Sequence, residues 1–201
     1  MTVVQSNFDK LKTDFAEWLT PDTDFLMGYL ICDRVAIWDP VWINPNEEIL
    51  PPVRFDQDAI ERLGIEVFEM PLAGGTIVNN VGDIGLFVAS KDRHSKWEIA
   101  AMEDMVRYLK LRYNLDATIN GNDVLLDDKK FIGTSIGFST FHRYAAMFIS
   151  MNNDTDKLIQ QICTKPSKHS GFVGLSKYDV CPRKLITRML RFTRKWEKRC
   201  L

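Results

Sequence analysis

The sequence predicts an α+β fold in which mixed, mostly antiparallel sheets pack against helices, within one domain that spans residues 1–201. Short apolar segments rich in β-branched residues alternate along the chain with segments whose apolar residues recur at helical spacing. No internal repeat and no low-complexity tract interrupts that alternation. A chain of 201 residues can bury a substantial apolar core in a single domain.

Strands are expected where short apolar runs are bounded by turn residues. Residues 25–32 (FLMGYLIC) and 35–38 (VAIW) are separated by Asp33-Arg34, a spacing that suits the two strands of a hairpin. The other expected strands lie within residues 65–70, 76–78, 84–90 and 117–151, with 76–78 and 84–90 paired around NNVGD.

Helices are expected where apolar residues share one face or where terminal signals occur. Residues 95–114 are the clearest case, because Ser95 and Glu98 occupy the positions of a capping box. The apolar residues along one side of that helix are typical of a core face. Gly64 is expected to end a short helix in the left-handed conformation. The expected helices lie within residues 6–19, 55–64, 95–114, 154–163 and 182–200, and the core face of the third comprises Trp97, Ala101, Met105 and Leu109.

The charge balance gives no global attraction for polyanions. With 26 Lys and Arg against 27 Asp and Glu, the formal net charge is −1. Such a charge predicts neither a nucleic-acid partner nor a membrane surface as partner. The helix at about 182–200 is locally basic, with Phe192 and Trp196 between its charges. An inward stripe on this helix favours a solvated basic face over a nucleic-acid site. The stripe comprises Ile186, Met189, Leu190, Thr193 and Trp196.

The cysteine spacing and the first residues indicate a cytoplasmic protein. Cys32, Cys163, Cys181 and Cys200 stand far apart, without the spacing of a zinc site or a disulfide framework. The N-terminal residues lack the apolar core of a signal peptide, and no apolar run is long enough to suggest a membrane span. Reduced thiols in the cytoplasm are therefore expected.

Two stretches of the sequence carry the candidate chemistry. In residues 72–85 (LAGGTIVNNVGDIG), the Gly74-Gly75 pair either lets the backbone approach a ligand closely or forms a tight turn that needs positive φ. In residues 121–136 (GNDVLLDDKKFIGTSI), Asp123 and Lys130 lie on neighbouring strands of a predicted hairpin. A carboxylate suits Mg²⁺ and a lysine suits a phosphate, although an ordinary hairpin has the same composition.

These stretches, taken in order, resemble the catalytic domain of the biotin/lipoate protein ligase family, in its lipoate-protein ligase A type. The matching residues are EMPLAGGTIVNNVGD, then GND, then KFIG, then FSTFHRYAAMFISMNNDTDKLIQQI, within about residues 25–180. The resemblance implies a class II ligase fold and a two-step reaction with ATP and Mg²⁺. Lipoate or octanoate would be activated to an acyl-adenylate and then passed to a lysine of a lipoyl-type acceptor domain.

The resemblance also implies roles for individual residues. Lys130 would be the catalytic amine between the acyl carboxylate and the α-phosphate, and its spacing to Gly133 selects it over Lys129. Asp123, helped by Asp83, would hold Mg²⁺. Phe68, Leu72, Ile77 and Val78 would line a narrow acyl tunnel. The implied nucleotide-binding and acyl-binding residues are Leu72, Gly74, Gly75, Thr76, Ile77, Val78, Asn79, Asn122 and Gly133.

The sequence departs from the family pattern at three places, which leaves a second function open. Glu69-Met70 replaces a double arginine, Asn79-Asn80 replaces His-Asp, and Asp83 replaces an asparagine. Losing two cations weakens the attraction for an anionic intermediate. The alternative is therefore a non-catalytic protein that uses the ligase fold to bind a lipoyl-type domain or a nucleotide. Biotin is disfavoured because LAGGTIV lacks the Gly-Arg-Gly-Arg loop of biotin ligases. A cysteine relay is disfavoured because KHSGFVGLSKY has no thiol.

Overall fold

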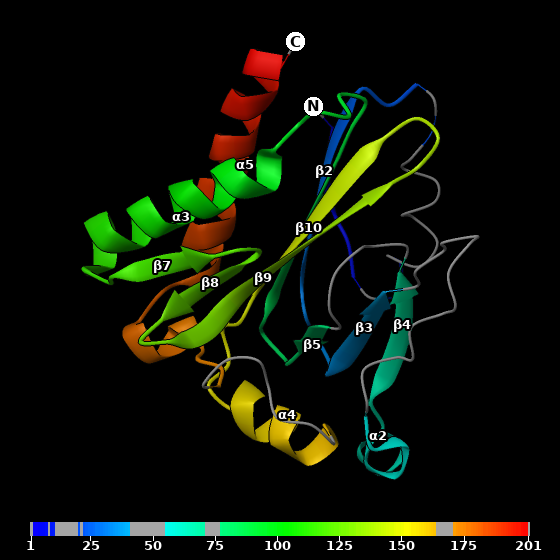
Figure 1. The fold of residues 1–201 in the computed structure, drawn as a ribbon, viewed down its shortest axis with the longest axis vertical. Coiled ribbons are helices and arrows are strands. Elements are labelled where there is room, and N and C mark those ends of the chain that lie inside the picture. Colours follow the sequence, from blue (N-terminus) through cyan, green and yellow to red (C-terminus); the bar gives the residue numbers. More distant parts are fainter. Residues whose placement is uncertain are drawn as a thin grey trace.

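In the described part of the chain, the fold consists of a seven-stranded sheet, a three-stranded sheet and helices that cover them (Figure 1). It was obtained as a computed structural model, which describes residues 2–7, 9–10, 20, 22–40, 55–70, 77–163 and 171–200. This architecture confirms the predicted α+β class with mixed, mostly antiparallel sheets. The helix expected over residues 6–19 falls largely outside the described residues.

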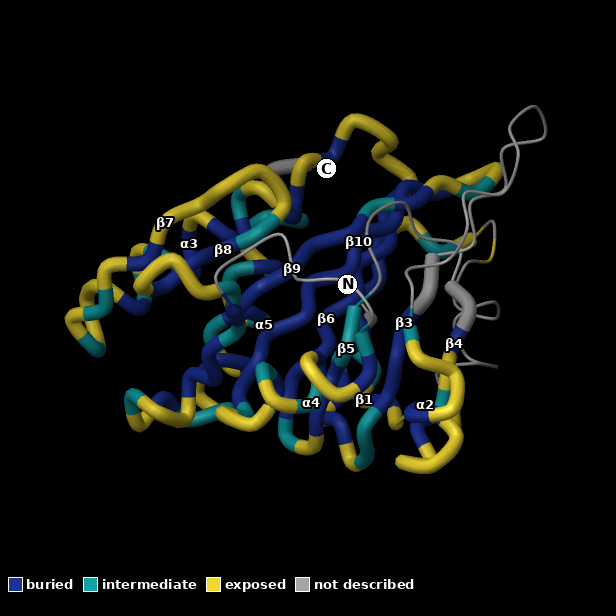
Figure 2. The backbone as a smooth tube through the Cα atoms, turned by 60° about the horizontal axis from the view of Figure 1, so that its bottom comes forward, coloured by how far each residue is buried: buried dark blue, intermediate teal, exposed yellow. Residues whose placement is uncertain are grey.

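The large sheet is antiparallel except at one edge, where its first two strands run parallel. The segment 117–151, in which strands were expected, supplies four of its strands. Figure 2 shows that the central strands are buried along their length, whereas β7 at the edge is largely exposed. In spatial order the strands are β1 (Thr2–Gln5), β2 (Phe25–Ile31), β6 (Ile84–Ser90), β10 (Arg143–Ile149), β9 (Lys129–Phe138), β8 (Asp123–Leu126) and β7 (Ala117–Asn120).

The small sheet has β3 (Ala36–Pro40) at its centre, parallel to β4 (Glu66–Met70) and antiparallel to β5 (Ile77–Asn79). Side chains of α2 (Gln57–Leu63) and α4 (Thr155–Ile162) pack on one side of it, in a cluster that includes Ile37, Ile60 and Ile162. As predicted, Gly64 ends α2 with a φ of 62°. At the start of α2, the Asp56 side chain accepts a hydrogen bond from the Ala59 N–H.

Two predicted strand pairings are wrong, although the strands themselves form. β2 and β3 do not make a hairpin, and β5 does not pair with β6, because in both cases the chain crosses from one sheet to the other. The crossing turns the apolar faces of the two sheets toward each other. Leu30 and Cys32 from one side of the first crossing and Ala36 and Trp38 from the other are thereby buried in one shared cluster.

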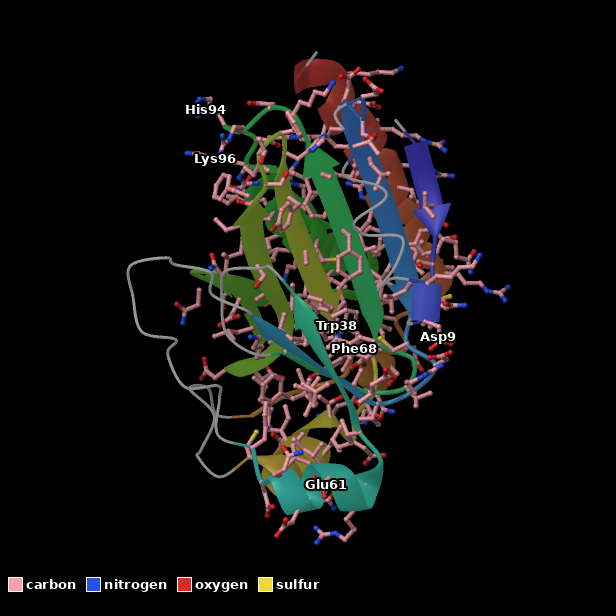
Figure 3. The ribbon with its side chains drawn as sticks, turned by 90° about the vertical axis from the view of Figure 1, so that its right-hand side faces the viewer. Asp9, Trp38, Glu61, Phe68, His94 and Lys96 are labelled. Atoms are coloured by element: carbon pink, nitrogen blue, oxygen red, sulfur yellow. The ribbon has the colours of Figure 1, made fainter. Side chains whose placement is uncertain are left out.

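That shared cluster, which we call the inter-sheet core, is rich in aromatic rings. The Trp38 ring stacks on Phe68 with 5.0 Å between centroids, and it lies 5.4 Å from the Phe148 ring of the large sheet. Figure 3 shows Trp38 and Phe68 side by side where the small sheet crosses the large one. The inter-sheet core comprises Leu30, Cys32, Ala36, Trp38, Phe68, Phe87, Ala89, Tyr144, Ala146 and Phe148.

The opposite face of the large sheet is covered by α3 (Trp97–Tyr113) and α5 (Pro182–Cys200), which cross each other (Figure 1). The predicted core face of α3 is confirmed, since Trp97, Ala101, Met105 and Leu109 are all buried. The inward stripe of α5 is confirmed as well: Ile186, Met189 and Thr193 are buried, with Leu190 and Trp196 packed against the same core. The Trp97 indole N–H donates to the Thr193 hydroxyl across the helix crossing, at 3.0 Å. A short 3₁₀ helix, η1 (Leu175–Tyr178), precedes α5.

The predicted capping box at the start of α3 does not form. Glu98 instead accepts two hydrogen bonds from the Arg143 guanidinium, at 2.6 and 2.9 Å, and the Ser95 hydroxyl has no partner among the described residues. Burial of Arg143 explains this difference, because a buried guanidinium requires a carboxylate more strongly than a helix start requires a cap. Among the described helices, none is long and apolar enough to cross a membrane.

Candidate active site

Two tight hairpins bring the predicted polar residues together at the β8–β9 pair. Gly121-Asn122 joins β7 to β8, with Gly121 at a φ of 61°. Asp127-Asp128 joins β8 to β9, and both residues have positive φ, at 51° and 59°. Two successive residues with positive φ are typical of the type I′ turn, whose twist matches that of the flanking strands. The turn therefore fixes the register in which Lys129 and Lys130 enter β9.

A bulge in β9 then places Lys130 and Gly133 on the same face of the sheet. Gly133 pairs with Asp123 and Ile132 with Val124, but Lys130 pairs with Leu125, so that Phe131 is the additional residue. In a regular strand, residues three apart point to opposite faces. One additional residue restores their common face, which is the physical reason why a lysine and a glycine at this spacing lie together.

The Lys130 ammonium lies against Gly133 and forms an ion pair with Asp123. Its Nζ is 2.7 Å from Asp123 Oδ1, with 21% and 14% of the two side chains exposed. A Cβ added at Gly133 would lie 2.9 Å from Lys130 Nζ and 3.0 Å from its Cε. A side chain at position 133 would therefore displace the ammonium. Lys129, in contrast, is exposed.

The backbone of Lys130 is held by a segment from a distant part of the sequence. Its N–H donates to the Gly171 carbonyl at 2.9 Å, and its carbonyl accepts from the Val173 N–H at 3.0 Å. At the next position, the Phe131 carbonyl accepts from the Ser150 N–H at 2.7 Å. These bonds complete the hydrogen bonding of the bulge, which β8 alone does not satisfy.

The ion pair lies beside the inter-sheet core. Gly133 is the cross-strand partner of Phe148, so both residues point to the same face of the large sheet, and Phe148 belongs to that core. The register of β9 puts Ser135 and Gly137 on this face too. A charged pair, a row of small residues and an apolar cluster thus follow one another across a single face.

The other predicted binding residues are less concentrated. Asn122 lies at the β7–β8 turn, and its carbonyl accepts hydrogen bonds from the Thr134 backbone N–H at 2.8 Å and from the Thr134 hydroxyl at 2.9 Å. Ile77 packs against the inter-sheet core, whereas Val78 packs on the opposite side of the small sheet. Val78 therefore does not line a common space with Ile77 and Phe68. Predicted residues Leu72, Gly74, Gly75 and Thr76 lie outside the described part of the chain.

Asp83 is buried in a structural hydrogen-bond network. Its carboxylate accepts backbone N–H groups from Asn80 at 2.8 Å, Met151 at 2.7 Å and Asn152 at 3.0 Å, and the Asn79 side chain also hydrogen bonds to it. Burial raises the pKa of Asp83 to about 6, against the opposing effect of these hydrogen bonds. Four donors occupy the carboxylate, an arrangement that suits a structural role better than the predicted help with a metal.

The Asp123 carboxylate fits a Mg²⁺ site only if a bound nucleotide supplies further oxygen ligands. Within the described ranges, no group of three or more His, Cys, Asp or Glu residues is arranged to hold a metal ion. Nucleotide-bound Mg²⁺ is commonly held by one or two carboxylates together with phosphate oxygens and water. Asp123 can supply one such carboxylate if its ion pair with Lys130 loosens.

Sequence reasoning missed three contributors to this site: Phe131, Gly171 and Phe148. The odd spacing between Lys130 and Gly133 was a signal for the bulge at Phe131, whereas nothing local in the sequence connects Gly171 with β9. A surface cavity of about 320 Å³ lies elsewhere, between the end of α3 and β7, and its lining includes none of the predicted site residues.

Comparisons with solved structures identify the fold. Lipoate-protein ligase A bound with ATP matches with a TM-score of 0.73 at 15% identity, over 98% of this chain and 85% of that chain. A bi-partite lipoate protein ligase from Thermoplasma acidophilum, described with its E2 lipoyl domain, matches with a TM-score of 0.72 at 14% identity, over 98% and 83%. P. falciparum LipL1 in complex with lipoate matches with a TM-score of 0.70 at 14% identity, over 98% and 61%, so the chain spans about three fifths of that protein.

The similarity lies in the fold. No family model matches the sequence, and no curated protein matches it at the sequence level. Structures of biotin protein ligase match with lower scores than the lipoate ligases. The chain therefore has the fold of a biotin/lipoate ligase-like catalytic domain, as the sequence motifs predicted.

Proposed function

We propose that this protein is a lipoate-protein ligase-like enzyme. In the first step, the carboxylate of lipoate or octanoate attacks the α-phosphorus of ATP, and pyrophosphate leaves as the acyl-adenylate forms. In the second step, a lysine amine of a lipoyl-type acceptor domain attacks the acyl carbonyl, and AMP leaves as the amide forms. Solved structures with this fold are described with ATP, with lipoate and with a lipoyl domain.

The observation that carries the proposal is the position of the Lys130–Asp123 pair beside the inter-sheet core. An acid with a long apolar tail needs a cation for its head and an apolar surface for its tail. Both features occur on one face of the sheet, separated by the small residues of β9. Among the described residues of the proposed acyl tunnel, Phe68, a member of the inter-sheet core, and Ile77, which packs against that core, lie on this side.

Lys130 would stabilise the negative charge that grows on the carboxylate and α-phosphate oxygens in both steps. A lysine ammonium has three N–H donors, and among the described residues Asp123 is its ion-pair partner. Asp123 would hold the ammonium toward Gly133 before the substrate binds. Bound with the nucleotide, Mg²⁺ would neutralise phosphate charge, with Asp123 as its protein ligand.

The test compares Lys130→Ala with Lys129→Ala in an assay of pyrophosphate release from ATP and lipoate in the presence of Mg²⁺. The rate for Lys130→Ala is expected to fall by about 10²–10³, as for removal of other preorganised charge-stabilising donors. Lys129→Ala is expected to behave like the parent protein, because that side chain points to solvent. The same pair of variants is then compared for acyl transfer to a lipoyl domain.

A folded Lys130→Ala protein with full activity in both assays contradicts the catalytic role. A parent protein that binds a lipoyl domain or ATP but releases no pyrophosphate supports the non-catalytic alternative. That alternative is favoured by the replacements at Glu69-Met70 and Asn79-Asn80.

A further inference from the structure

We infer that Asp156, on α4, is a positioning residue for Lys130, an inference that rests on the proposed function for its catalytic consequence. Asp156 does not contact Lys130 directly. It holds the segment Gly171–Val173, which in turn supplies both backbone hydrogen bonds to Lys130. The inference assigns α4 a role in the site, although it is remote from β9 in sequence.

The direction of the Lys130 side chain depends on the backbone conformation at Lys130. Because of the bulge at Phe131, β8 alone does not determine the backbone conformation at Lys130. The hydrogen bonds to Gly171 and from Val173, at 2.9 and 3.0 Å, determine it instead, as a parallel bridge between Lys130 and Phe172. A shift of Gly171–Val173 would therefore rotate Lys130 away from Gly133 and Asp123.

Asp156 in turn contacts the backbone of Gly171–Val173. Asp156 Oδ1 accepts the Phe172 N–H at 3.1 Å, while the Gln160 side chain donates to Asp156 Oδ2 at 3.2 Å. Gly171 has a φ of 133°, and a Cβ built on it would lie 2.9 Å from Asp156 Oδ1. The carboxylate thus packs directly on a backbone that only glycine adopts readily.

The other end of this segment has a separate anchor. The Leu175 N–H donates to the Ser150 carbonyl at 3.0 Å, and the Ser176 N–H donates to the Met151 carbonyl at 3.1 Å. Because these bonds hold the segment after Val173, removal of Asp156 is expected to release mainly Gly171 and Phe172. The consequence should be a local displacement at Lys130 without loss of the fold.

The test uses Asp156→Ala, Asp156→Asn and the control Asp154→Ala. Asp154 precedes the same helix and pairs with exposed Lys157, so its removal changes the same charge at the same helix end. Amide hydrogen exchange is measured at Lys130, Val173 and Ile132. In Asp156→Ala, exchange at Lys130 and Val173 is expected to accelerate by about ten-fold or more, with Ile132 unchanged. Asp156→Asn keeps an acceptor oxygen and is expected to restore protection.

The catalytic consequence is measured separately, by pyrophosphate release. Asp156→Ala is expected to lower kcat by about 10- to 100-fold, because misplacing a catalytic group reduces the rate by a factor of this order. KM for ATP should change little, and Asp154→Ala should match the parent. In a Lys130→Ala background, Asp156→Ala should cause no further loss, because a residue that acts through Lys130 has no effect once the amine is absent.

The two readouts distinguish failure of the inference from failure of the proposed function. Unchanged exchange at Lys130 in Asp156→Ala overturns the inference, as does a loss of kcat that persists in full in the Lys130→Ala background. Accelerated exchange at Lys130 in Asp156→Ala, together with a parent protein that releases no pyrophosphate, supports the positioning role and overturns the proposed function alone. Urea midpoints of all variants verify that the folded state is the one being compared.

Discussion

At the scale of single residues, the site depends on Gly133, where a side chain would displace the Lys130 ammonium. Gly133 lies opposite Asp123, and its missing side chain leaves room for the Lys130 ammonium. The added carbon of an alanine would meet the flexible end of Lys130 and not the backbone. Lys130 can therefore move aside, which makes the expected cost functional more than structural.

We expect Gly133→Ala to slow pyrophosphate release by about 10²-fold, because the displaced ammonium no longer faces the reacting oxygens. The urea midpoint should change little, since surrounding backbone is not contacted. Lys129→Ala serves as the control for a change in the neighbouring side chain. A Gly133→Ala protein that retains the parent rate would show that activity does not require the Lys130 ammonium to lie against residue 133.

Asp83 leads to a prediction about pH. Its pKa in the folded protein is raised to about 6 from an ordinary value of 3.8, because its carboxylate is buried. The folded state therefore binds the proton more tightly than the unfolded state. The associated stability is fully present below about pH 4 and is lost as the pH rises through about 6.

We expect the free energy of unfolding of the parent protein, relative to Asp83→Asn, to fall by up to about 3 kcal/mol between pH 4 and pH 7. The measurement is urea unfolding of both proteins across this range. Other titrating groups contribute to both curves, so the difference between the curves isolates Asp83. A difference that does not vary with pH would contradict the raised pKa.

At the scale of elements, buried charge determines how α3 joins the large sheet. Glu98 at the start of α3 and Arg143 at the start of β10 form a two-bonded ion pair, with 7% and 8% of their side chains exposed. Further along α3, Asp104 accepts hydrogen bonds from Arg188 of α5. The helix is thus tied at two points by arginine, in addition to its apolar face.

We expect Glu98→Ala to lower the free energy of unfolding by about 3–5 kcal/mol, because it leaves the Arg143 guanidinium buried without a partner. Glu103→Ala is the matched control, since it removes the same side chain from an exposed position of the same helix. Chemical denaturation of the two variants gives the comparison. Equal, small effects of the two changes would show that Arg143 finds another partner or reaches water.

At the scale of the whole molecule, the two sheets are joined through aromatic rings of the inter-sheet core. Trp38 contacts Phe68 within its own sheet, and Phe87 and Phe148 across the interface. Since the proposed acyl surface is part of this interface, the placement of the small sheet affects both stability and binding.

We expect Trp38→Ala to lower the free energy of unfolding by about 3–5 kcal/mol, the usual cost of removing a large buried ring. Hydrogen exchange should accelerate more in β3 and β4 than in β9 and β10, because the small sheet loses its main contact with the large one. Trp196→Ala, on α5 at the opposite face, is the control. Uniform acceleration in all four strands of Trp38→Ala would mean that the two sheets unfold as a single unit.

The sequence alone determined most elements and the identity of the central pair. Turn residues and apolar periodicity located the described helices and strands other than β1 and η1, because both are local properties of the chain. The spacing of Asp123, Lys130 and Gly133 within 11 residues of one hairpin region made them predictable together. Their catalytic use remains a proposal.

Which strands pair, and what supports the site, depends on contacts between distant segments of the chain. Whether β2 meets β3 or β6 depends on which pairing buries both apolar faces, and that depends on the whole chain. Glu98 forms an ion pair with the buried Arg143, 45 positions away, instead of capping the helix. The contacts of Lys130 with Gly171 and Val173, and of Phe172 with Asp156, join segments with no local signal. Local sequence patterns therefore identified most of the elements and the central site residues. Burial between distant segments of the chain determined how they are arranged.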